Sequence, residues 1–128
     1  MSEEPPTILI LVDDDAHVLA SLKFAFEVEG FEVHAYCDAE SLLAESDFQQ
    51  RGCLVLDYKL PGINGLQLLK VLRSRGVTLP AVLITTPSPD VLSRAAAAGV
   101  PVVDKPLLTN ALLETVRRQL ERGPKSKG

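Results

Sequence analysis

The chain has 128 residues, a formal net charge of −4 and a hydrophobic fraction of 46%. This length predicts a single domain over residues 1–128, with an ordered core at about 7–121 and polar tails at both ends. The acidic balance argues against a protein whose main task is to bind nucleic acid. No apolar run approaches the ~18 residues of a membrane span. The acidic start, MSEEPPT, lacks the pattern of a secretory signal, so we expect a cytoplasmic protein.

Apolar runs alternate with amphipathic segments from the first residues onward. Residues 8–12 are apolar and β-branched without interruption, which predicts a strand buried on both faces. A helix is expected over about 16–29, with Gly30 in the position of a C-cap. Residues 31–35 alternate like a short strand, and Asp38 is a suitable N-cap for a second helix.

The second half of the chain continues this alternation. In chain order we expect a strand at 53–56, a helix at about 64–75, a strand at 81–85, a helix at about 90–98, a strand at 100–104 and a helix at 107–120. Five strands alternating with five helices predict an α/β fold, a doubly wound five-stranded parallel sheet with helices on both faces. Pro101 favours an edge position for the fifth strand, because proline cannot donate to a central ladder.

Polar residues gather where four of the predicted strands end. In chain order they are Asp13, Asp14 and Asp15, then Asp57, then Thr85 and Thr86, and finally Asp104 and Lys105. The carboxyl ends of the strands form the site in open α/β sheets, so these side chains should meet in one crevice. Converging carboxylates need compensation, which Mg²⁺ can supply. Lys105 could meet the same need by leaning into the cluster.

This set of groups suits a carboxylate that accepts a phosphoryl group. Asp57 would be the nucleophile, and Lys105 and Thr85 would bind the phosphoryl oxygens. The chain has no glycine-rich phosphate-binding motif, which argues against a nucleotide site.

Each of these residues also has a purely structural interpretation. Helix capping would explain the acidic run after the first strand, but one cap needs one residue and Asp15 can supply it. A turn would explain Asp57, and a solvated strand end would explain Lys105. Thr86 competes with Thr85, because a slip of one residue along a strand reverses its face. We favour Thr85.

Four segments resemble the response-regulator receiver domain, in its order and over nearly the whole chain: ILILVDDD, CLVLDYKLPGINGLQLL, PAVLITT and VVDKPL. The resemblance implies the flavodoxin-like strand order 2-1-3-4-5. It implies that Asp57 is the phosphoacceptor, that Thr85 is the switch hydroxyl and that Lys105 acts beside them. Pro106 would follow the peptide bond that is usually cis in this family. The implied Mg²⁺ ligands are Asp13, Asp14, Asp57 and the main-chain carbonyl of Lys59.

The resemblance also implies a function. A histidine kinase or a histidine phosphotransfer protein would donate the phosphoryl group to Asp57. The domain would then signal to a downstream protein by contact, and phosphorylation could also lead it to form a homodimer. Direct binding to nucleic acid or membrane is not expected. It would be a signalling protein and not an enzyme. One alternative is a pseudo-receiver that binds a partner constitutively, and a weaker one is a Mg²⁺-dependent phosphatase. The sequence leaves open whether the domain acts alone or within a longer regulator.

Two features depart from the family pattern. Val102 stands where receiver domains usually have an aromatic residue in the fifth strand. The segment between Thr85 and Lys105 is shorter than usual and contains Pro87 and Pro89, which restrict the backbone. Both departures concern the surface that would pass the signal on, so we expect the phosphorylation chemistry to be retained.

Overall fold

The computed structural model describes residues 6–45, 52–86, 88–105 and 110–122. Strands and helices alternate through these residues, and in chain order they are β1 (Ile8–Val12), α1 (Ala16–Val28), β2 (Glu32–Tyr36), α2 (Ala39–Leu43), β3 (Gly52–Asp57), α3 (Gly65–Ser74), β4 (Ala81–Thr85), α4 (Pro89–Ala98), β5 (Val102–Asp104) and α5 (Ala111–Arg122). None of the described helices has the length and hydrophobicity needed to cross a membrane.

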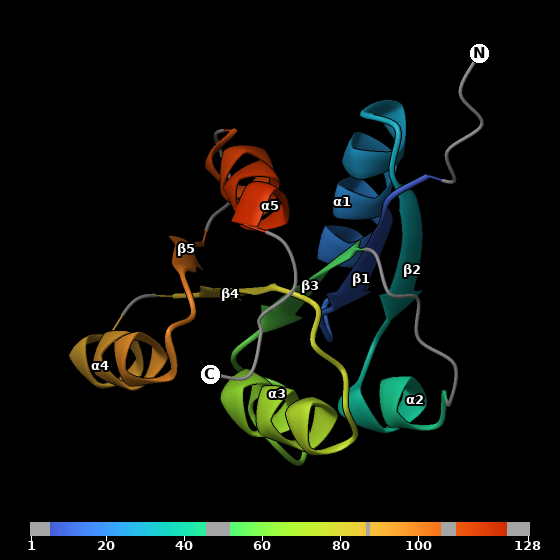
Figure 1. Cartoon of the computed structure of the whole chain (residues 1–128). Helices are drawn as coiled ribbons and strands as arrows, with labels where there is room; N and C mark the ends of the chain where they lie inside the picture. Colours follow the sequence, from blue (N-terminus) through green and yellow to red (C-terminus); the bar gives the residue numbers. More distant parts are fainter. Residues whose placement is uncertain (1–5, 46–51, 87, 106–109, 123–128) are drawn as a thin grey trace.

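The five strands form one parallel sheet in the order β2-β1-β3-β4-β5. Helices α1 and α5 cover one face, and α2, α3 and α4 cover the other (Figure 1). This confirms the predicted fold class and strand order. The three inner strands are buried at every residue, whereas the edge strands β2 and β5 are buried only in part. Strands that are covered on both faces must be apolar throughout, which explains the uninterrupted apolar runs in the sequence.

Two apolar cores lie on opposite faces of the sheet, because successive side chains of a strand point to opposite sides. Along β1, Ile8, Ile10 and Val12 pack with residues of α2, α3 and α4. Leu9 and Leu11 pack in the other core, with residues of α1 and α5. Burial of one such side chain contributes about 1.5–3 kcal/mol. Packing on both faces therefore holds the inner strands, and with them the polar residues at their carboxyl ends.

Several element boundaries differ by one or two residues from those expected; β3, for example, spans Gly52–Asp57 in place of the predicted 53–56. Strand β2 begins and ends one residue later than the predicted 31–35. Strand β5 begins after Pro101, which has no N–H to give, although its carbonyl accepts a hydrogen bond from the Leu83 amide at 2.9 Å. Helix α5 is described from Ala111, and residues 107–109 of the predicted helix lie outside the described residues.

Candidate functional site

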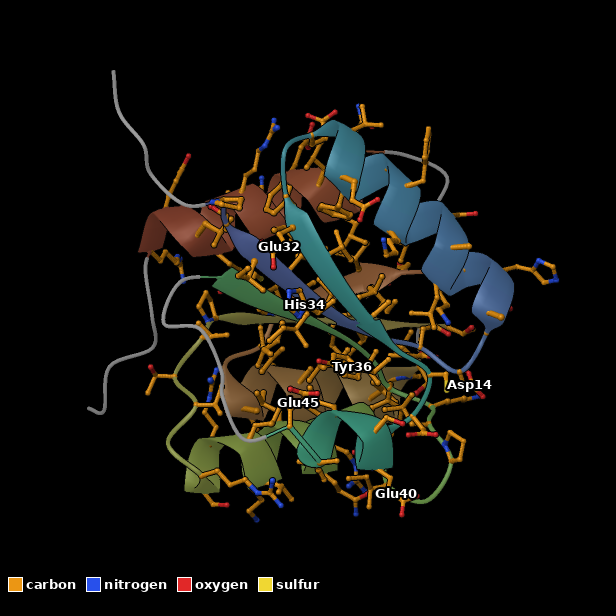
Figure 2. The ribbon with its side chains drawn as sticks, turned by 90° about the vertical axis from the view of Figure 1, so that its right-hand side faces the viewer. Asp14, Glu32, His34, Tyr36, Glu40 and Glu45 are labelled. Carbon is orange, nitrogen blue, oxygen red and sulfur yellow. The ribbon has the colours of Figure 1, made fainter. Side chains whose placement is uncertain are left out.

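Three carboxylates meet at the carboxyl ends of β1 and β3. One carboxylate oxygen from each of Asp13, Asp14 and Asp57 lies within 4.8 Å of the others. Asp13 is 0% exposed and Asp57 is 3% exposed, although both are acidic. Asp14 lies at the surface at this end of the sheet (Figure 2). The site therefore combines two buried carboxylates with one that remains in contact with solvent.

The turn after β1 assigns different tasks to its three aspartates. The Asp13 amide donates to the Tyr36 carbonyl at 3.1 Å, and Asp13 Oδ1 accepts from the Asp15 amide at 2.9 Å. Asp15 is the N-cap of α1, since its carboxylate accepts from the His17 amide at 2.9 Å. Asp15 therefore begins the helix, as expected, and Asp13 is left with one oxygen, Oδ2, that the turn does not use.

The Lys105 ammonium lies between the two buried carboxylates. Lys105 Nζ donates to Asp57 Oδ2 at 3.1 Å and lies 3.1 Å from Asp13 Oδ2. The contact with Asp13 is an ion pair outside hydrogen-bond geometry, because Asp13 Oδ2 is buried and accepts no hydrogen bond from the part of the chain that the structure describes. One cation thus serves two carboxylates, the arrangement that the sequence suggested as an alternative to a metal.

Burial and charge shift the pKa values of Asp57 and Lys105. Removal from water and, as a smaller cause, the negative charge of Asp13 together raise the pKa of Asp57, which is about 6 after all effects. The Lys105 ammonium and the Lys59 amide oppose the rise. Burial lowers the pKa of Lys105, but its contacts with Asp13 and Asp57 outweigh that effect and raise the pKa above its ordinary value. Asp57 is therefore ionised at neutral pH, close to the range in which it takes up a proton.

Close backbone packing holds Asp57 in place. The Gly65 amide at the start of α3 donates to the Tyr58 carbonyl at 2.8 Å. A Cβ at Gly65 would lie 2.5 Å from the Asp57 carbonyl oxygen and 2.9 Å from Leu83 Cδ1, so no larger residue fits there without a shift. Asn64 fixes the first turn of α3 by a reciprocal pair of hydrogen bonds with Gln67. The conformation of the turn after Asp57 thus depends on a glycine.

Lys59 contacts the site through its amide, which donates to Asp57 Oδ1 at 3.4 Å. Its side chain is exposed. No described contact involves its carbonyl, so the expected role of that oxygen as a metal ligand stays a prediction.

Thr85 is the last residue of β4, and it is 1% exposed. Its hydroxyl donates to the Thr86 carbonyl at 3.1 Å, and its own carbonyl accepts from the Lys105 amide at 2.9 Å. The structure thus joins Thr85 to Lys105 through the backbone, while Thr86 is exposed. Among the described contacts none joins the Thr85 hydroxyl to a carboxylate, so its role as a switch stays a prediction.

The two departures from the family pattern and the expected cis bond can be followed for Val102 but not for Pro87 and Pro106. Val102, in place of the usual aromatic residue, is partly buried against the core that β1 shares with α2, α3 and α4. Pro87 and Pro106 lie outside the described residues, and so does the expected cis bond before Pro106.

The residues at this site fit a Mg²⁺ ion. Hard oxygen ligands suit this metal, and it usually binds one or two carboxylates while keeping several waters. Asp13, Asp14 and Asp57 supply such oxygens, and the buried Asp13 Oδ2 accepts no hydrogen bond from the described residues that a metal would have to replace. A cation here would face the same oxygens that Lys105 now neutralises.

A cavity of about 580 Å³ adjoins Lys105, and it was not expected from the sequence. Its lining residues come from the first turns of α1 and from the ends of β4 and β5: Asp15, His17, Val18, Ser21, Leu22, Thr86 and Lys105. The spacing of Asp15, Val18 and Leu22 on one face of a helix that starts at the site was the available signal.

Comparison with known proteins identifies the family. A family model for the response regulator receiver domain matches residues 9–117. The chain belongs to this family. The receiver domain is 34% identical over 117 residues to the C4-dicarboxylate transport transcriptional regulatory protein DctD of Pseudomonas aeruginosa, covering 90% of the chain and 25% of DctD. It is 36% identical over 115 residues to the transcriptional regulatory protein FixJ of Azorhizobium caulinodans, covering 88% of the chain and 54% of FixJ. The receiver domain thus spans a quarter to about half the length of these relatives.

Solved structures agree with this assignment. The response regulator StyR superposes on the receiver domain with a TM-score of 0.83 and 31% sequence identity, over 93% of this chain and 61% of StyR. A CheY-like receiver domain protein from Methanospirillum hungatei superposes with a TM-score of 0.80 and 29% identity, over 92% of this chain and 96% of that one. The predicted receiver-domain family and architecture are therefore confirmed.

Proposed function

We propose that the receiver domain accepts a phosphoryl group on Asp57 from a histidine kinase or a histidine phosphotransfer protein, in a Mg²⁺-dependent reaction. The domain then acts on a downstream protein by direct contact, in the cytoplasm. The observation that carries the proposal is the position of Asp57, which is 3% exposed and lies against Asp13, Asp14 and Lys105. A cation-binding site built around one such carboxylate suits phosphoryl transfer, which relies mainly on positioning and charge compensation.

Asp57 has the protonation state that the reaction needs. Its pKa of about 6 leaves the carboxylate ionised at neutral pH. One of its oxygens forms a bond to phosphorus while the bond from phosphorus to the donor imidazole nitrogen breaks, and the nitrogen keeps the electron pair. Lys105, already in contact with both buried carboxylates, stabilises the negative charge on the transferred group. Mg²⁺, held by Asp13, Asp14 and Asp57, would supply further positive charge to the phosphoryl oxygens.

The cavity beside Lys105 supports access for a protein donor. It measures about 580 Å³ and lies between the start of α1 and the ends of β4 and β5. A histidine side chain that approaches Asp57 needs such an opening at the surface. His17 and Ser21 line the opening, and both are exposed. We expect these two side chains to contact the donor protein.

Incubation with acetyl phosphate and Mg²⁺, followed by intact-protein mass spectrometry, tests the proposal. We expect one added phosphoryl group in the native chain, and none after chelation of the metal or in Asp57→Asn. Asp104→Asn is the matched control, because Asp104 is an exposed carboxylate at the end of β5. It should be labelled like the native chain. No mass gain in the native chain, or an equal gain in Asp57→Asn, would overturn the proposal.

The pseudo-receiver alternative has less support. A constitutive binding module needs no buried carboxylates with a shared cation, and burial of such groups is costly. Binding to an isolated downstream partner should therefore respond to Asp57→Asn and to chelation. An affinity that neither change affects would favour the alternative.

A further inference from the structure

A second concave site lies at the opposite end of the sheet from Asp57. It is a cleft of about 470 Å³ between α3 and α4, near the points where β4 and β5 begin. Both helices lie on the same face of the sheet (Figure 1). The apolar part of its lining includes Leu66, Leu69, Pro80, Ala97, Ala98 and Val100. The small side chains of Ala97 and Ala98 leave room between the helices, and we call this space the α3–α4 cleft.

The charged residues that line the α3–α4 cleft are all basic: Lys70, Arg73 and Arg94. Arg73 is held in a fixed orientation, since its Nη1 donates to the Val77 carbonyl at 3.0 Å and to the Leu79 carbonyl at 2.6 Å. Among the described residues its Nε and Nη2 make no hydrogen bond, so their N–H groups can donate to a ligand. Lys70 has no ion-pair partner within the described ranges of the chain. The cleft therefore presents one oriented guanidinium and one unpaired ammonium beside an apolar surface.

This concentration of positive charge runs against the composition of the protein. The chain carries a net charge of −4. Acidic side chains gather elsewhere, on β2 and around α2, where Glu32, Glu40 and Glu45 lie (Figure 2). Within the part of the chain that the structure describes, Arg94 is the one basic residue of the three that pairs with a carboxylate, with its Nε 3.0 Å from Asp90 Oδ2. The cleft thus has the charge that complements an anion.

We propose that the α3–α4 cleft binds a small organic anion. Its apolar body would lie against the side chains of α3 and α4, and its carboxylate, sulfonate or phosphate group would be bound by Lys70 and Arg73. A volume of about 470 Å³ matches the size of small-molecule sites, which are mainly apolar with a few oriented polar groups. The chain's own last residues, GPKSKG, are an unsuitable occupant, because their two lysines would be repelled by the basic lining.

The test compares two probes that differ by one anionic group. The anionic probe is 1-anilinonaphthalene-8-sulfonate, and the neutral one is N-phenyl-1-naphthylamine, which has the same aromatic body without the sulfonate. Fluorescence titration of the full chain gives both affinities, and amide chemical shifts locate the probes. We expect the sulfonate to bind more tightly than the amine, with the largest shifts at Leu69, Lys70, Gly99 and Val100.

Four variants make the test specific. Ala97→Leu should fill the cleft and weaken sulfonate binding, whereas Ala96→Leu, at an exposed position of α4 outside the cleft, should not. Lys70→Gln should weaken it about twofold, the scale of one exposed ion pair. Lys23→Gln on α1 controls for net charge.

Three results would overturn the proposal. They are equal affinity for the two probes, largest shifts beside Lys105 in place of the cleft, and an Ala97→Leu variant that binds like the native chain. None of these results depends on phosphorylation of Asp57, so they do not bear on the function proposed above.

Discussion

Replacement of Asp57 by asparagine should make the protein more stable at pH 8, although the residue is buried and lies at the centre of the site. Asp57 and Asp13 are two buried carboxylates that share the single ammonium of Lys105. An amide at position 57 keeps the size of the side chain and removes one of the two negative charges. Lys105 would then be paired with Asp13 alone.

The pKa of Asp57 sets the magnitude of this effect. A rise from 3.8 to about 6 corresponds to about 3 kcal/mol, at 1.36 kcal/mol per pKa unit. Between pH 4 and pH 6 the folded protein binds more protons than the unfolded chain, so the free energy of unfolding falls as pH rises through this window and is level above it. We expect Asp57→Asn to gain about 2–3 kcal/mol over the native chain at pH 8. The gain should approach zero near pH 4.

Urea unfolding with EDTA present, at pH values from 4 to 8 and constant ionic strength, measures this difference. Asp104→Asn is the control, because it removes an exposed carboxylate and should change the free energy of unfolding by less than about 0.5 kcal/mol. The reasoning is refuted if Asp57→Asn is less stable than the native chain at pH 8, or if the difference between them is the same at all pH values.

Three further predictions concern packing and charge, two of them at the site and one at Arg73 in the α3–α4 cleft. Lys105→Met should raise the pKa of Asp57 above 6, by about one unit or more, because it removes the cation that opposes burial and the charge of Asp13. Carboxyl carbon NMR shifts measured against pH would show this, and an unchanged pKa would contradict it. Gly65→Ala should cost about 1–3 kcal/mol of stability, since its Cβ would lie 2.5 Å from the Asp57 carbonyl oxygen. Gly62→Ala is the comparison. At Gly62 no atom lies within 4 Å of an added Cβ but φ is positive, so a cost there reflects backbone strain and not crowding. Arg73→Met should cost about 2–3 kcal/mol in urea unfolding through the loss of its bonds to the Val77 and Leu79 carbonyls, and an effect below about 0.5 kcal/mol would show that water replaces them.

The sequence predicts the fold well because the inner strands carry a strong pattern. Strands that are covered on both faces must be apolar at every position, so 8–12, 53–56 and 81–85 stand out, and the polar residues after them mark the strand ends. The register of β2 was harder, since its alternation is short and a shift of one residue leaves most of the pattern intact. At β5 the predicted strand was two residues too long, because it included Val100 and Pro101. Pro101 has no N–H, and the strand begins after it.

The site was predictable in its composition and only partly in its geometry. The convergence of Asp13 and Asp57 follows from the rule that parallel strands end at one edge. The exact pairing of Lys105 with both does not, because it depends on where a long flexible side chain finds its lowest energy. The α3–α4 cleft was likewise invisible, since it depends on the distance that Ala97 and Ala98 allow between two helices. The hydrogen bonds from Arg73 to main-chain carbonyls could not be predicted either, because the spacing of apolar residues carries no information about them.

The position of Lys105 makes the charge of the site depend on the end of an edge strand. Lys105 directly follows β5, a strand of three residues that pairs with β4 and with no other described strand, and its amide donates to the Thr85 carbonyl. The side chain of Lys105 therefore supplies the counter-charge of the site, while its main-chain amide extends the hydrogen bonding between β4 and β5 by one bond. A cation that displaces the Lys105 ammonium from Asp13 and Asp57 removes a restraint on the hydrogen bond from the Lys105 amide to Thr85. By linkage, an opening of β5 weakens the contact of the ammonium with the two carboxylates. We expect Mg²⁺ to speed amide hydrogen exchange at Lys105 and to slow it at Asp15. Metal binding beside the inner strands would then loosen the edge strand β5.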